Sequence, residues 1–331
     1  MEAYPWKSSP VVTRYEGNPI LKPEDMPFPS TMVYNPGVEK FKGRYVMLFR
    51  NLHYQVRWTK RTHFLGWATS DDGVHWTVDP DARFEVEGLT GPADPRLTVL
   101  DGRCYACVQE SENVSKSAIG IRGAVTVSDD LEHWELLSLS TPDNRNMVLF
   151  PERVNGRIAR LERPFRKCTH CHTSTGEAWY SESPDGRYWG NSRRVLAIED
   201  VPFANEKTGP GAAPIRTDKG WLALFHAVYV DPKITYPTWR NEDIHWVYAA
   251  GVMLLDLDDP SKIIGLAREP LIVPEAPYDC EIDGYRSYTV FPTGNILEDD
   301  GTVKIYYGAA DSSICLATAK LDDLIALCTP V

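Results

Sequence analysis

The chain has 331 residues, with 46 acidic and 35 basic side chains and a formal net charge of −11. This charge argues against a nucleic-acid surface, which needs a basic stripe, and against binding to an anionic membrane. No apolar run approaches the roughly 20 residues of a membrane-spanning helix. The N-terminal stretch MEAYPWKSSPVV has no apolar core of the signal-peptide kind, so we expect a cytoplasmic protein.

The seven cysteines fit reduced thiols better than a disulfide framework, because an odd number cannot pair completely. Cys104/Cys107 and Cys168/Cys171 are both spaced C-x-x-C, with histidines beside the second pair, and two such pairs are compatible with a zinc site. However, Cys104 and Cys107 lie in a predicted strand, where residues three apart point to opposite faces. We therefore expect partly buried thiols and no metal.

Five strand-like hairpins follow one another along the chain. Their turns are Lys42-Gly43, Asp101-Gly102, Asn155-Gly156, Lys219-Gly220 and Asp300-Gly301. Each turn leads into an apolar or alternating run, from RYVMLFR in the first to TVKIYYGAA in the last. Asn-Gly and Asp-Gly between such runs predict β-hairpins, because these residues tolerate a positive φ.

A second motif follows the first three hairpins and reads WATSDDGVHW, AVTVSDDLEHW and WYSESPDGRYW. The fourth and fifth units keep the strand and the acidic turn but lose the final Trp, and only KLDDLIAL near the end predicts a short helix. Repeats of four short strands around a centre form a β-propeller. We therefore predict an all-β, five-bladed β-propeller with a central active-site funnel; a β-sandwich with similar hairpins is the alternative. Residues 1–331 would form a single domain, with a short N-terminal extension over about residues 1–15.

In a propeller the inner strands of all blades face one channel, so polar residues at their ends would meet in a funnel. The candidates are Asn35, Arg50, Asp94, Arg145, Arg163, Lys207, His226 and Asp311. Each has an ordinary reading when taken alone: Asp94-Pro95 is a common turn start, and His226 after an apolar run is more often a core histidine. Together, two carboxylates and several cations favour a site that holds a small anion such as phosphate.

The same set of residues distinguishes two reactions. An inverting glycosidase needs a second carboxylate about 6.5–9.5 Å from the acid, to activate water. If phosphate replaces water, that base is unnecessary, because phosphate is already anionic and nucleophilic. One acid with a cationic cradle therefore favours phosphorolysis.

At these residues the sequence resembles glycoside hydrolase family 130, the mannoside phosphorylases and related β-mannosidases. The similarity runs through nearly the whole chain and includes YEGNPILKPEDMP, ADPRLT, RNMVLFPERVNGRIARLERP, KTGPGAAPIRTDKGWLALFHAV and IYYGAAD. The resemblance implies a five-bladed propeller. It also implies reversible, inverting phosphorolysis of non-reducing-end β-mannosides to α-mannose 1-phosphate, with inorganic phosphate as co-substrate and no cofactor.

The resemblance further implies a role for each candidate residue. Asp94 matches the family's proton donor, whose proton is thought to reach the glycosidic oxygen through the mannose 3-hydroxyl. The phosphate-binding positions of the phosphorylases, which the family's hydrolases lack, match Arg145, Arg163, Lys207 and His226. The positions that hold the mannose match Asn35, Arg50 and Asp311.

Acceptor recognition is less well defined. We expect Tyr285, Tyr288 and Tyr54 near the funnel mouth, where they would either stack on acceptor sugars or simply pack. The chain departs from the family's pattern at residues 63–67 and at Ala93, where an acceptor would be contacted. The linkage (β-1,2 or β-1,4) and the acceptor sugar therefore stay open, as does a homo-oligomer, since family members often assemble.

Two other functions also stay open. A β-mannosidase would share the fold but would use water and an essential second carboxylate. A non-catalytic mannoside-binding propeller would bind without turnover. Furanosidase propellers are a further rival, but they use three carboxylates, and no third can be assigned in this sequence.

Overall fold

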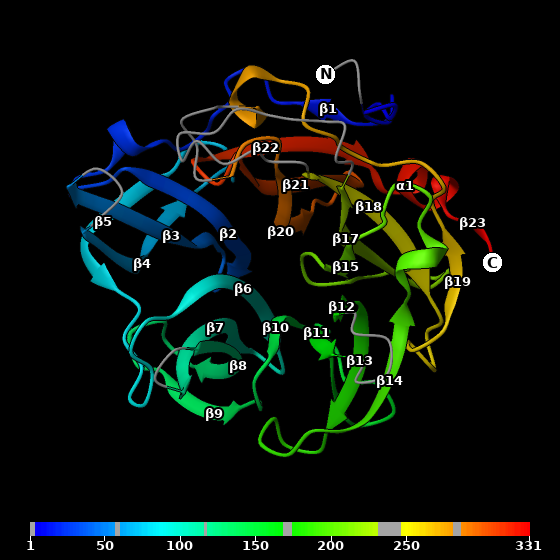
Figure 1. Cartoon of the computed structure of the whole chain (residues 1–331), viewed down its shortest axis with the longest axis horizontal. Coiled ribbons are helices and arrows are strands. Elements are labelled where there is room, and N and C mark those ends of the chain that lie inside the picture. Colours follow the sequence, from blue (N-terminus) through cyan, green and yellow to red (C-terminus); the bar gives the residue numbers. More distant parts are fainter. Residues whose placement is uncertain (1–3, 57–59, 116–117, 168–173, 231–245, 281–285) are drawn as a thin grey trace.

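The computed structural model describes residues 4–56, 60–115, 118–167, 174–230, 246–280 and 286–331. Five antiparallel blades surround a central axis, which confirms the predicted all-β, five-bladed propeller (Figure 1). Helix α1 (Leu321–Leu327) lies where the sequence predicts a short helix. No helix in the described ranges is long and apolar enough to span a membrane.

The first three blades have four strands each, in order from the axis outward. Blade 1 contains β2 (Met32–Phe41), β3 (Arg44–Val56), β4 (Lys60–Ser70) and β5 (Thr77–Arg83). Blade 2 contains β6 (Ala93–Leu100), β7 (Arg103–Ser115), β8 (Ala118–Ser128) and β9 (Glu135–Leu139). Blade 3 contains β10 (Asn144–Leu149), β11 (Ile158–Lys167), β13 (Ala178–Ser183) and β14 (Gly190–Leu196).

The last two blades are less regular. Blade 4 has a divided inner strand, β15 (Lys207–Pro210) and β16 (Ile215–Arg216), followed by β17 (Trp221–Val230), β18 (Trp246–Leu255) and β19 (Ile263–Leu266). Blade 5 contains β20 (Val290–Leu297), β21 (Thr302–Ala309) and β22 (Ser313–Lys320). The short strand β12 (Ser174–Gly176) pairs with β11 and β15 and so joins blades 3 and 4.

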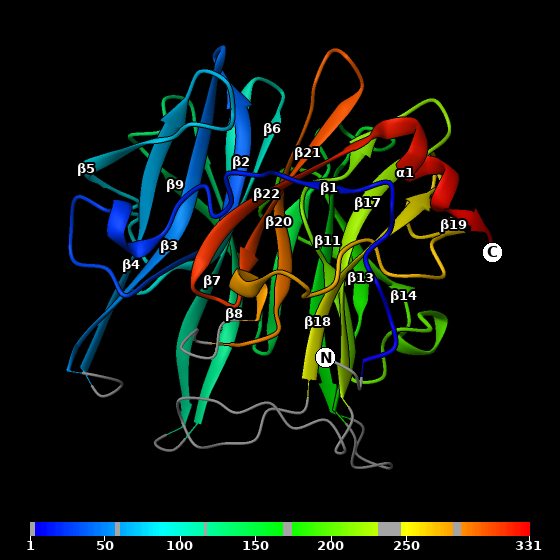
Figure 2. The same ribbon diagram turned by 90° about the horizontal axis from the view of Figure 1, so that it is seen from above.

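Both ends of the described chain close the ring. Strand β1 (Thr13–Arg14), which the prediction placed in the N-terminal extension, pairs with β22 and forms the outermost strand of blade 5 (Figure 2). The Arg14 guanidinium lies 2.9 Å from the buried Asp279 carboxylate. This ion pair links β1 to the segment that precedes β20. Strand β23 (Thr329–Pro330) pairs with β19 of blade 4.

The hairpin turns differ between the first three units and the last two. Lys42-Gly43, Asp101-Gly102 and Asn155-Gly156 all have positive φ at both residues, between 50° and 82°. This is the conformation of a type I′ turn, which matches the twist of the flanking strands. The corresponding hairpin turns of the fourth and fifth units are longer, and within these two turns only Gly220 and Gly301 have positive φ.

The repeated Ser-x-Asp motif forms the same turn in three blades. In blade 1 the Ser70 Oγ accepts the Gly73 N–H at 2.8 Å, and Asp72 Oδ1 accepts the backbone N–H groups of Val74 and His75. Equivalent bonds form at Ser128 with Asp130 and at Ser183 with Asp185. The motif is therefore structural, and it explains why this part of the sequence repeats.

In every blade, the pairing of the innermost strand with its neighbour is interrupted at a point that faces the axis. The register shifts between Tyr34 and Gly37, between Ala93 and Arg96, between Arg145 and Val148, and between Pro292 and Gly294. Blade 4 has the gap between β15 and β16 at the corresponding place. These interruptions lie beside one another, since a Cβ on Gly37 would touch the Pro95–Arg96 backbone and one on Gly294 would touch Pro36 O. A β-bulge leaves a residue unpaired and re-aims its side chain.

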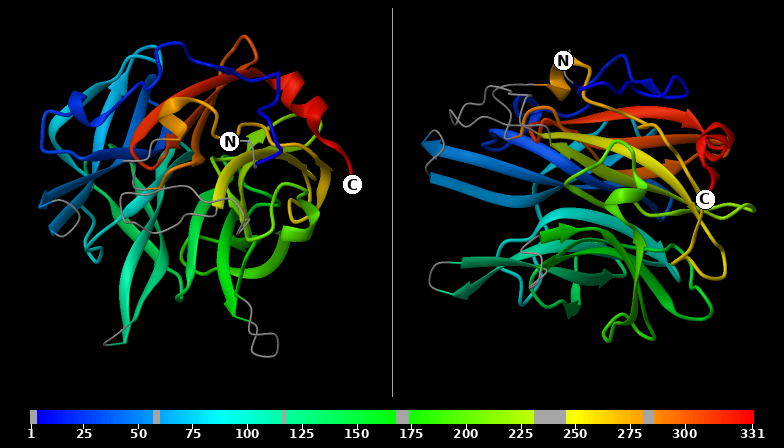
Figure 3. Two further views of the ribbon diagram at one scale, coloured as in Figure 1. Left: turned by 45° about the horizontal axis from the view of Figure 1, so that its top comes forward. Right: turned by 45° about the vertical axis from the view of Figure 1, so that its right-hand side comes forward.

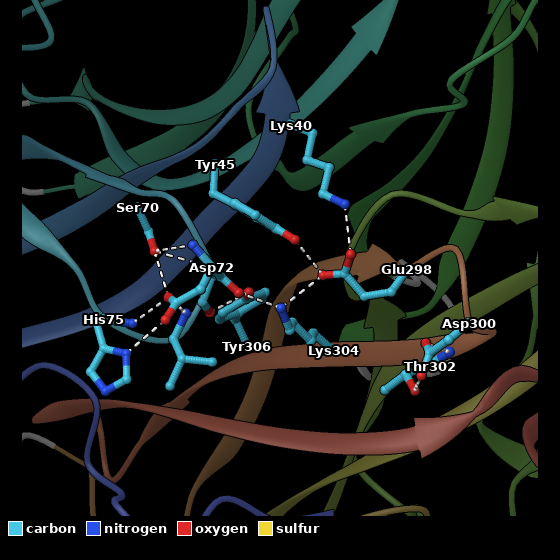
Figure 4. A network of polar contacts seen from close by, with 12 residues as sticks. Lys40, Tyr45, Ser70, Asp72, His75, Glu298, Asp300, Thr302, Lys304 and Tyr306 are labelled. Atoms are coloured by element: carbon cyan, nitrogen blue, oxygen red, sulfur yellow. Dashed lines mark hydrogen bonds and ion pairs between the residues drawn. The ribbon is translucent and has the colours of Figure 1, made fainter.

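Blades 1 and 5 are joined by the Glu298 carboxylate, which follows β20 (Figure 4). It accepts hydrogen bonds from Lys40 Nζ at 2.6 Å and Tyr45 OH at 2.7 Å, both in blade 1, and from Lys304 Nζ of blade 5 at 2.8 Å. Lys304 Nζ also donates to Asp72 O at 2.5 Å. Burial alone would raise the pKa of Glu298, but the bonds from Lys304, Lys40 and Tyr45 lower it to about 2.

We predict that Glu298→Gln lowers the free energy of unfolding at pH 7 by about 1–2 kcal/mol. Because the folded pKa lies below the ordinary value of 4.5, the carboxylate stabilises the fold above about pH 4.5 and loses this effect as the pH falls towards 2. Denaturant unfolding at pH 7 and pH 3 should therefore show a smaller difference from the unmodified protein at pH 3. The exposed Glu269→Gln is the control, and an equal loss at both pH values would contradict the prediction.

Candidate active site

The inner strands enclose a cavity of about 290 Å³ on the axis. Its lining contains Asn35, Arg50, Arg61, Ala93, Asp94, Gln109, Ser111, Ile121, Arg145, Asn146, Arg163, Tyr248, Arg286, Thr289, Phe291 and Asp311. Five of these residues are arginines and two are aspartates. The cavity therefore carries a positive excess, in contrast to the negative net charge of the whole chain.

The long hairpins of blades 1 and 2 extend beyond the other strands on one face of the propeller (Figure 3). Strands β3 and β7 have 13 residues each, and β4 and β8 have 11 each. Arg61 on β4, Ser111 on β7 and Ile121 on β8 lie on these hairpins and line the cavity. The hairpins thus form part of the cavity wall, on the side from which a substrate would enter.

Six of the eight predicted funnel residues line this cavity. They are Asn35, Arg50, Asp94, Arg145, Arg163 and Asp311. Lys207 and His226 lie directly behind the lining, against Tyr248 and Arg163 respectively. Tyr285, Cys168 and Cys171 lie outside the described residues.

The other predicted residues lie in the protein core. Tyr54 packs against a cluster of Met32, Tyr34 and Leu52, and Tyr288 packs against the core between blades 3 and 4, so neither lines the cavity. Cys104 and Cys107 are buried in different core clusters, as expected for opposite faces of a strand. Within the described ranges, no group of three or more His, Cys, Asp or Glu side chains could hold a metal ion.

Asp94 lies in the bulge of β6, with a left-handed φ of 48°. Its Oδ1 accepts hydrogen bonds from Asn35 Nδ2 at 3.0 Å and Arg50 Nη1 at 3.1 Å, and its Oδ2 accepts one from Gln109 Nε2. Burial alone would raise the pKa of Asp94, but Arg50, Asn35 and Arg96 outweigh it and hold the pKa below the usual value. In the resting site Asp94 is a carboxylate.

Asp311 lies in the turn between β21 and β22. Ala310 and Asp311 both have positive φ, of 51° and 49°, and the Ser312 N–H donates to Ala309 O at 2.9 Å, which forms a type I′ turn. Burial raises the pKa of Asp311 to about 6; Arg286 and Arg50 oppose this rise, and the Asp94 carboxylate adds to it. At pH 7 both carboxyl groups of the cavity are therefore largely ionised, and Asp311 gains a proton first as the pH falls.

Two arginines of blade 3 flank the ring of Phe165. The Arg145 and Arg163 guanidinium carbons lie 4.6 Å and 5.0 Å from its centroid. Arg145 pairs with Asp143 at 2.8 Å, but no ion pair in the described ranges involves Arg163. Burial, together with neighbouring arginines, lowers the pKa of Arg163 to about 9. The buried Nε of both arginines has no hydrogen-bond partner among the described residues, so the pair can accommodate an anion.

Tyr248 and Arg286 belong to the site, although the sequence reasoning did not select them. Arg286 Nη1 donates to Tyr248 OH at 2.5 Å, and Lys207 Nζ lies 5.4 Å from the Tyr248 ring centroid. Burial alone would raise the pKa of Tyr248, but Arg286, the hydrogen-bonded Lys207 and Arg163 lower it. Tyr248 lies on β18 and Arg286 precedes β20, outside the strand ends from which the candidates were taken.

His226 is completely buried behind Arg163. Its Nδ1 lies 3.1 Å from Pro210 O, which can only accept, so Nδ1 carries the proton and Nε2 carries a lone pair. Nε2 faces Arg163 Nη1 and accepts from it. Burial and the nearby Arg163 hold the pKa of His226 well below 6.5. His226 is therefore a neutral acceptor that orients Arg163, and it contributes no positive charge.

The chain is similar to known mannoside phosphorylases. A family model described as beta-1,4-mannooligosaccharide phosphorylase, of glycoside hydrolase family 130, matches residues 5–330. The chain is 30% identical to the beta-1,4-mannooligosaccharide phosphorylase of Ruminococcus albus, over 97% of this chain and 93% of that protein. It is 27% identical to a 1,2-beta-oligomannan phosphorylase of Thermoanaerobacter sp., over 94% and 98%.

A solved structure has the same fold. The beta-1,2-mannobiose phosphorylase of Listeria innocua, in complex with beta-1,2-mannobiose, has a TM-score of 0.78 to this chain at 24% sequence identity. The match covers 96% of this chain and 98% of that chain. The family match over nearly the full length, the level of identity to the Ruminococcus albus protein and the shared propeller lead to one conclusion: this chain belongs to glycoside hydrolase family 130.

Proposed function

We propose that this protein is an inverting β-mannoside phosphorylase. The observation that carries the proposal is the positive excess of the axial cavity, and above all the buried Arg163, which no carboxylate in the described ranges neutralises. Guanidinium groups match the geometry and charge of phosphate oxygens. A neutral sugar alone would leave these cations without an anion.

In the proposed reaction, phosphate binds between Arg145, Arg163 and Lys207, with His226 acting through Arg163. A phosphate oxygen uses a lone pair to form a bond to the anomeric carbon of a non-reducing β-mannosyl unit. The bond from that carbon to the glycosidic oxygen breaks, and this oxygen takes a proton that originates from Asp94 and, by resemblance to the family, passes through the mannose 3-hydroxyl. The products are α-mannose 1-phosphate and a shortened sugar.

Asp94 must gain a proton before it can act as an acid, because it is ionised in the resting site. A bound phosphate brings negative charge into the cavity that contains the Asp94 carboxylate. A nearby negative charge raises a carboxyl pKa. Phosphate thus supplies the nucleophile and also favours the acid form of Asp94. Such preorganised electrostatics are often the largest contribution to catalysis.

Asn35, Arg50 and Asp311 are proposed to hold the mannose. Asn35 and Arg50 bond to Asp94 and line the same cavity, so they can position the sugar against the acid. Asp311, from the neighbouring blade 5, can accept bonds from sugar hydroxyls. The linkage stays open between β-1,2 and β-1,4, because the relatives named above include phosphorylases of both kinds.

Hydrolysis is the second candidate, because Asp311 places a second carboxyl group in the cavity. A hydrolytic base must be ionised, and Asp311, whose pKa burial raises to about 6, meets this condition at pH 7, so its charge state does not separate the two reactions. Hydrolysis would, however, leave Arg145 and Arg163 without a role. This second observation favours phosphorolysis.

We further propose inorganic phosphate as the co-substrate, no cofactor, and a cytoplasmic location. The five cysteines in the described ranges are all free thiols, which is typical of a reducing compartment.

The first test is incubation with α-mannose 1-phosphate and a panel of acceptor sugars, with released phosphate as the readout. We expect release with at least one of mannose, glucose, N-acetylglucosamine and manno-oligosaccharides.

Asp94→Asn should lower kcat by about 10³-fold, because the amide keeps the shape but cannot supply a proton. Lys207→Ala should mainly raise the KM for phosphate in the forward reaction. Phosphate-independent cleavage of β-mannosides would contradict the proposal, and binding without turnover would favour the non-catalytic propeller.

A second prediction concerns His226. His226→Leu removes the acceptor that orients Arg163 and should raise the KM for phosphate about tenfold, with little change in the KM for the mannoside. His226→Gln can still present an oxygen to Arg163 and should lose less. Equal losses in both variants would contradict the neutral-acceptor role and favour a cationic histidine.

A further inference from the structure

The two oxygens of Asp94 have different partners. Oδ1 accepts from both Asn35 Nδ2 and Arg50 Nη1, at 3.0 and 3.1 Å. Among the described residues, Oδ2 is contacted by a single donor, Gln109 Nε2. Proton exchange at Asp94 therefore depends on the group that lies opposite Oδ2.

The proton of the acid form belongs on Oδ2. A guanidinium can donate but cannot accept, so an Oδ1 that receives the Arg50 bond cannot point a proton towards it. A protonated Oδ2 in turn cannot keep an N–H donor opposite it, because two hydrogens would then meet. The partner of Oδ2 must be able to change from donor to acceptor.

We propose that Gln109 is a positioning residue whose amide turns over with the protonation state of Asp94, donating N–H to the carboxylate and presenting its carbonyl oxygen to the acid. Among side chains, a primary amide offers both groups at nearly the same position. The inference rests on the proposed function, in which Asp94 is the proton donor. Gln109 acts through Asp94 and need not touch the reacting atoms.

Small residues flank Gln109 on both neighbouring strands. Gln109 lies on β7, where its cross-strand partners are Ala93 on β6 and Gly123 on β8. Directly opposed residues share a face of the sheet, so the two side chains beside Gln109 are a methyl group and a hydrogen, with the Met147 side chain packed over Gly123. No partner in the described ranges holds the carbonyl oxygen Oε1 of Gln109, which lines the cavity. Ala93 is also a position at which this chain departs from the family's usual pattern.

Turnover would use both orientations. With the carbonyl towards Oδ2–H, Gln109 stabilises the acid form, and the proton turns from this carbonyl to the sugar hydroxyl at transfer. Once the proton has left for the sugar hydroxyl, the N–H group stabilises the resulting carboxylate. The reverse reaction uses the same two states in the opposite order.

Other charged groups act on Asp94 and stay unchanged in the variants below. Arg50 on β3, Arg96 on β6 and Asp311 after β21 interact with it directly. The remaining ionisable groups of the cavity lining are Arg61, Arg145, Arg163, Tyr248 and Arg286. Any change in pH dependence can therefore be assigned to the amide itself.

The test is the pH profile of kcat/KM for phosphorolysis by the full chain with Gln109→Met, which keeps the length but removes the amide. Both states of Asp94 lose a partner, but the bond to the charged carboxylate is the stronger one, so the pKa of Asp94 should rise and the basic limb should move up by about one pH unit. Loss of the acceptor should lower kcat on the plateau about tenfold, with the KM for phosphate unchanged. Gln109→Glu should move the limb further, because two carboxyl groups then share a proton.

Two outcomes would overturn the inference. One is a profile that keeps its shape and position while the rate falls, which indicates a merely structural role. The other is a limb that moves to lower pH. If Gln109→Met does not fold, as judged by thermal unfolding, Gln109→Glu decides alone by the same criterion. An unmodified protein without phosphorolysis would reject the proposed function instead, so the two failures are distinguishable.

Discussion

The active site depends on the break in the hydrogen-bond ladder of the inner strand of every blade. A regular inner strand would pair all its backbone groups and alternate its side chains between the neighbouring blades. The bulges instead leave Asn35, Asp94 and Asn146 in the left-handed region and in the cavity lining. Asn and Asp tolerate this conformation better than most residues, which explains why these types occur there. One backbone constraint, repeated around the ring, thus collects polar groups at the axis.

The charges of the cavity then divide into two groups. Asp94 is surrounded by donors from blades 1 and 2, whereas Arg145, Arg163 and Lys207 come from blades 3 and 4. The acid and the anion site are therefore on different sides of the ring, as an in-line displacement with inversion requires. Tyr248 lies among the cations and links them by hydrogen bonds. The propeller thus keeps the acid and the anion site apart, and no mobile element has to be assumed.

The sequence predicts the blades well because their signals are local. The hairpin turns need Gly, and the repeated acidic turns need Ser and Asp two residues apart. Both requirements are local, so they are visible in a single sequence. Asp94, Arg145 and Arg163 are found for a related reason, since each lies within a distinctive motif. Gln109 and Tyr248 are missed because they alternate like any other strand residues on β7 and β18. The neutral state of His226 is likewise hidden, since the distant carbonyl of Pro210 sets it.

The central claim is that phosphate, and not water, attacks the mannosyl unit. It is tested most directly by ³¹P and ¹H NMR of the protein with a β-mannobiose, in buffers with and without inorganic phosphate. The account predicts an α-mannose 1-phosphate signal that grows in step with loss of the disaccharide, and no cleavage without phosphate. Free mannose formed at the same rate in both buffers, with the phosphate signal unchanged, would contradict it.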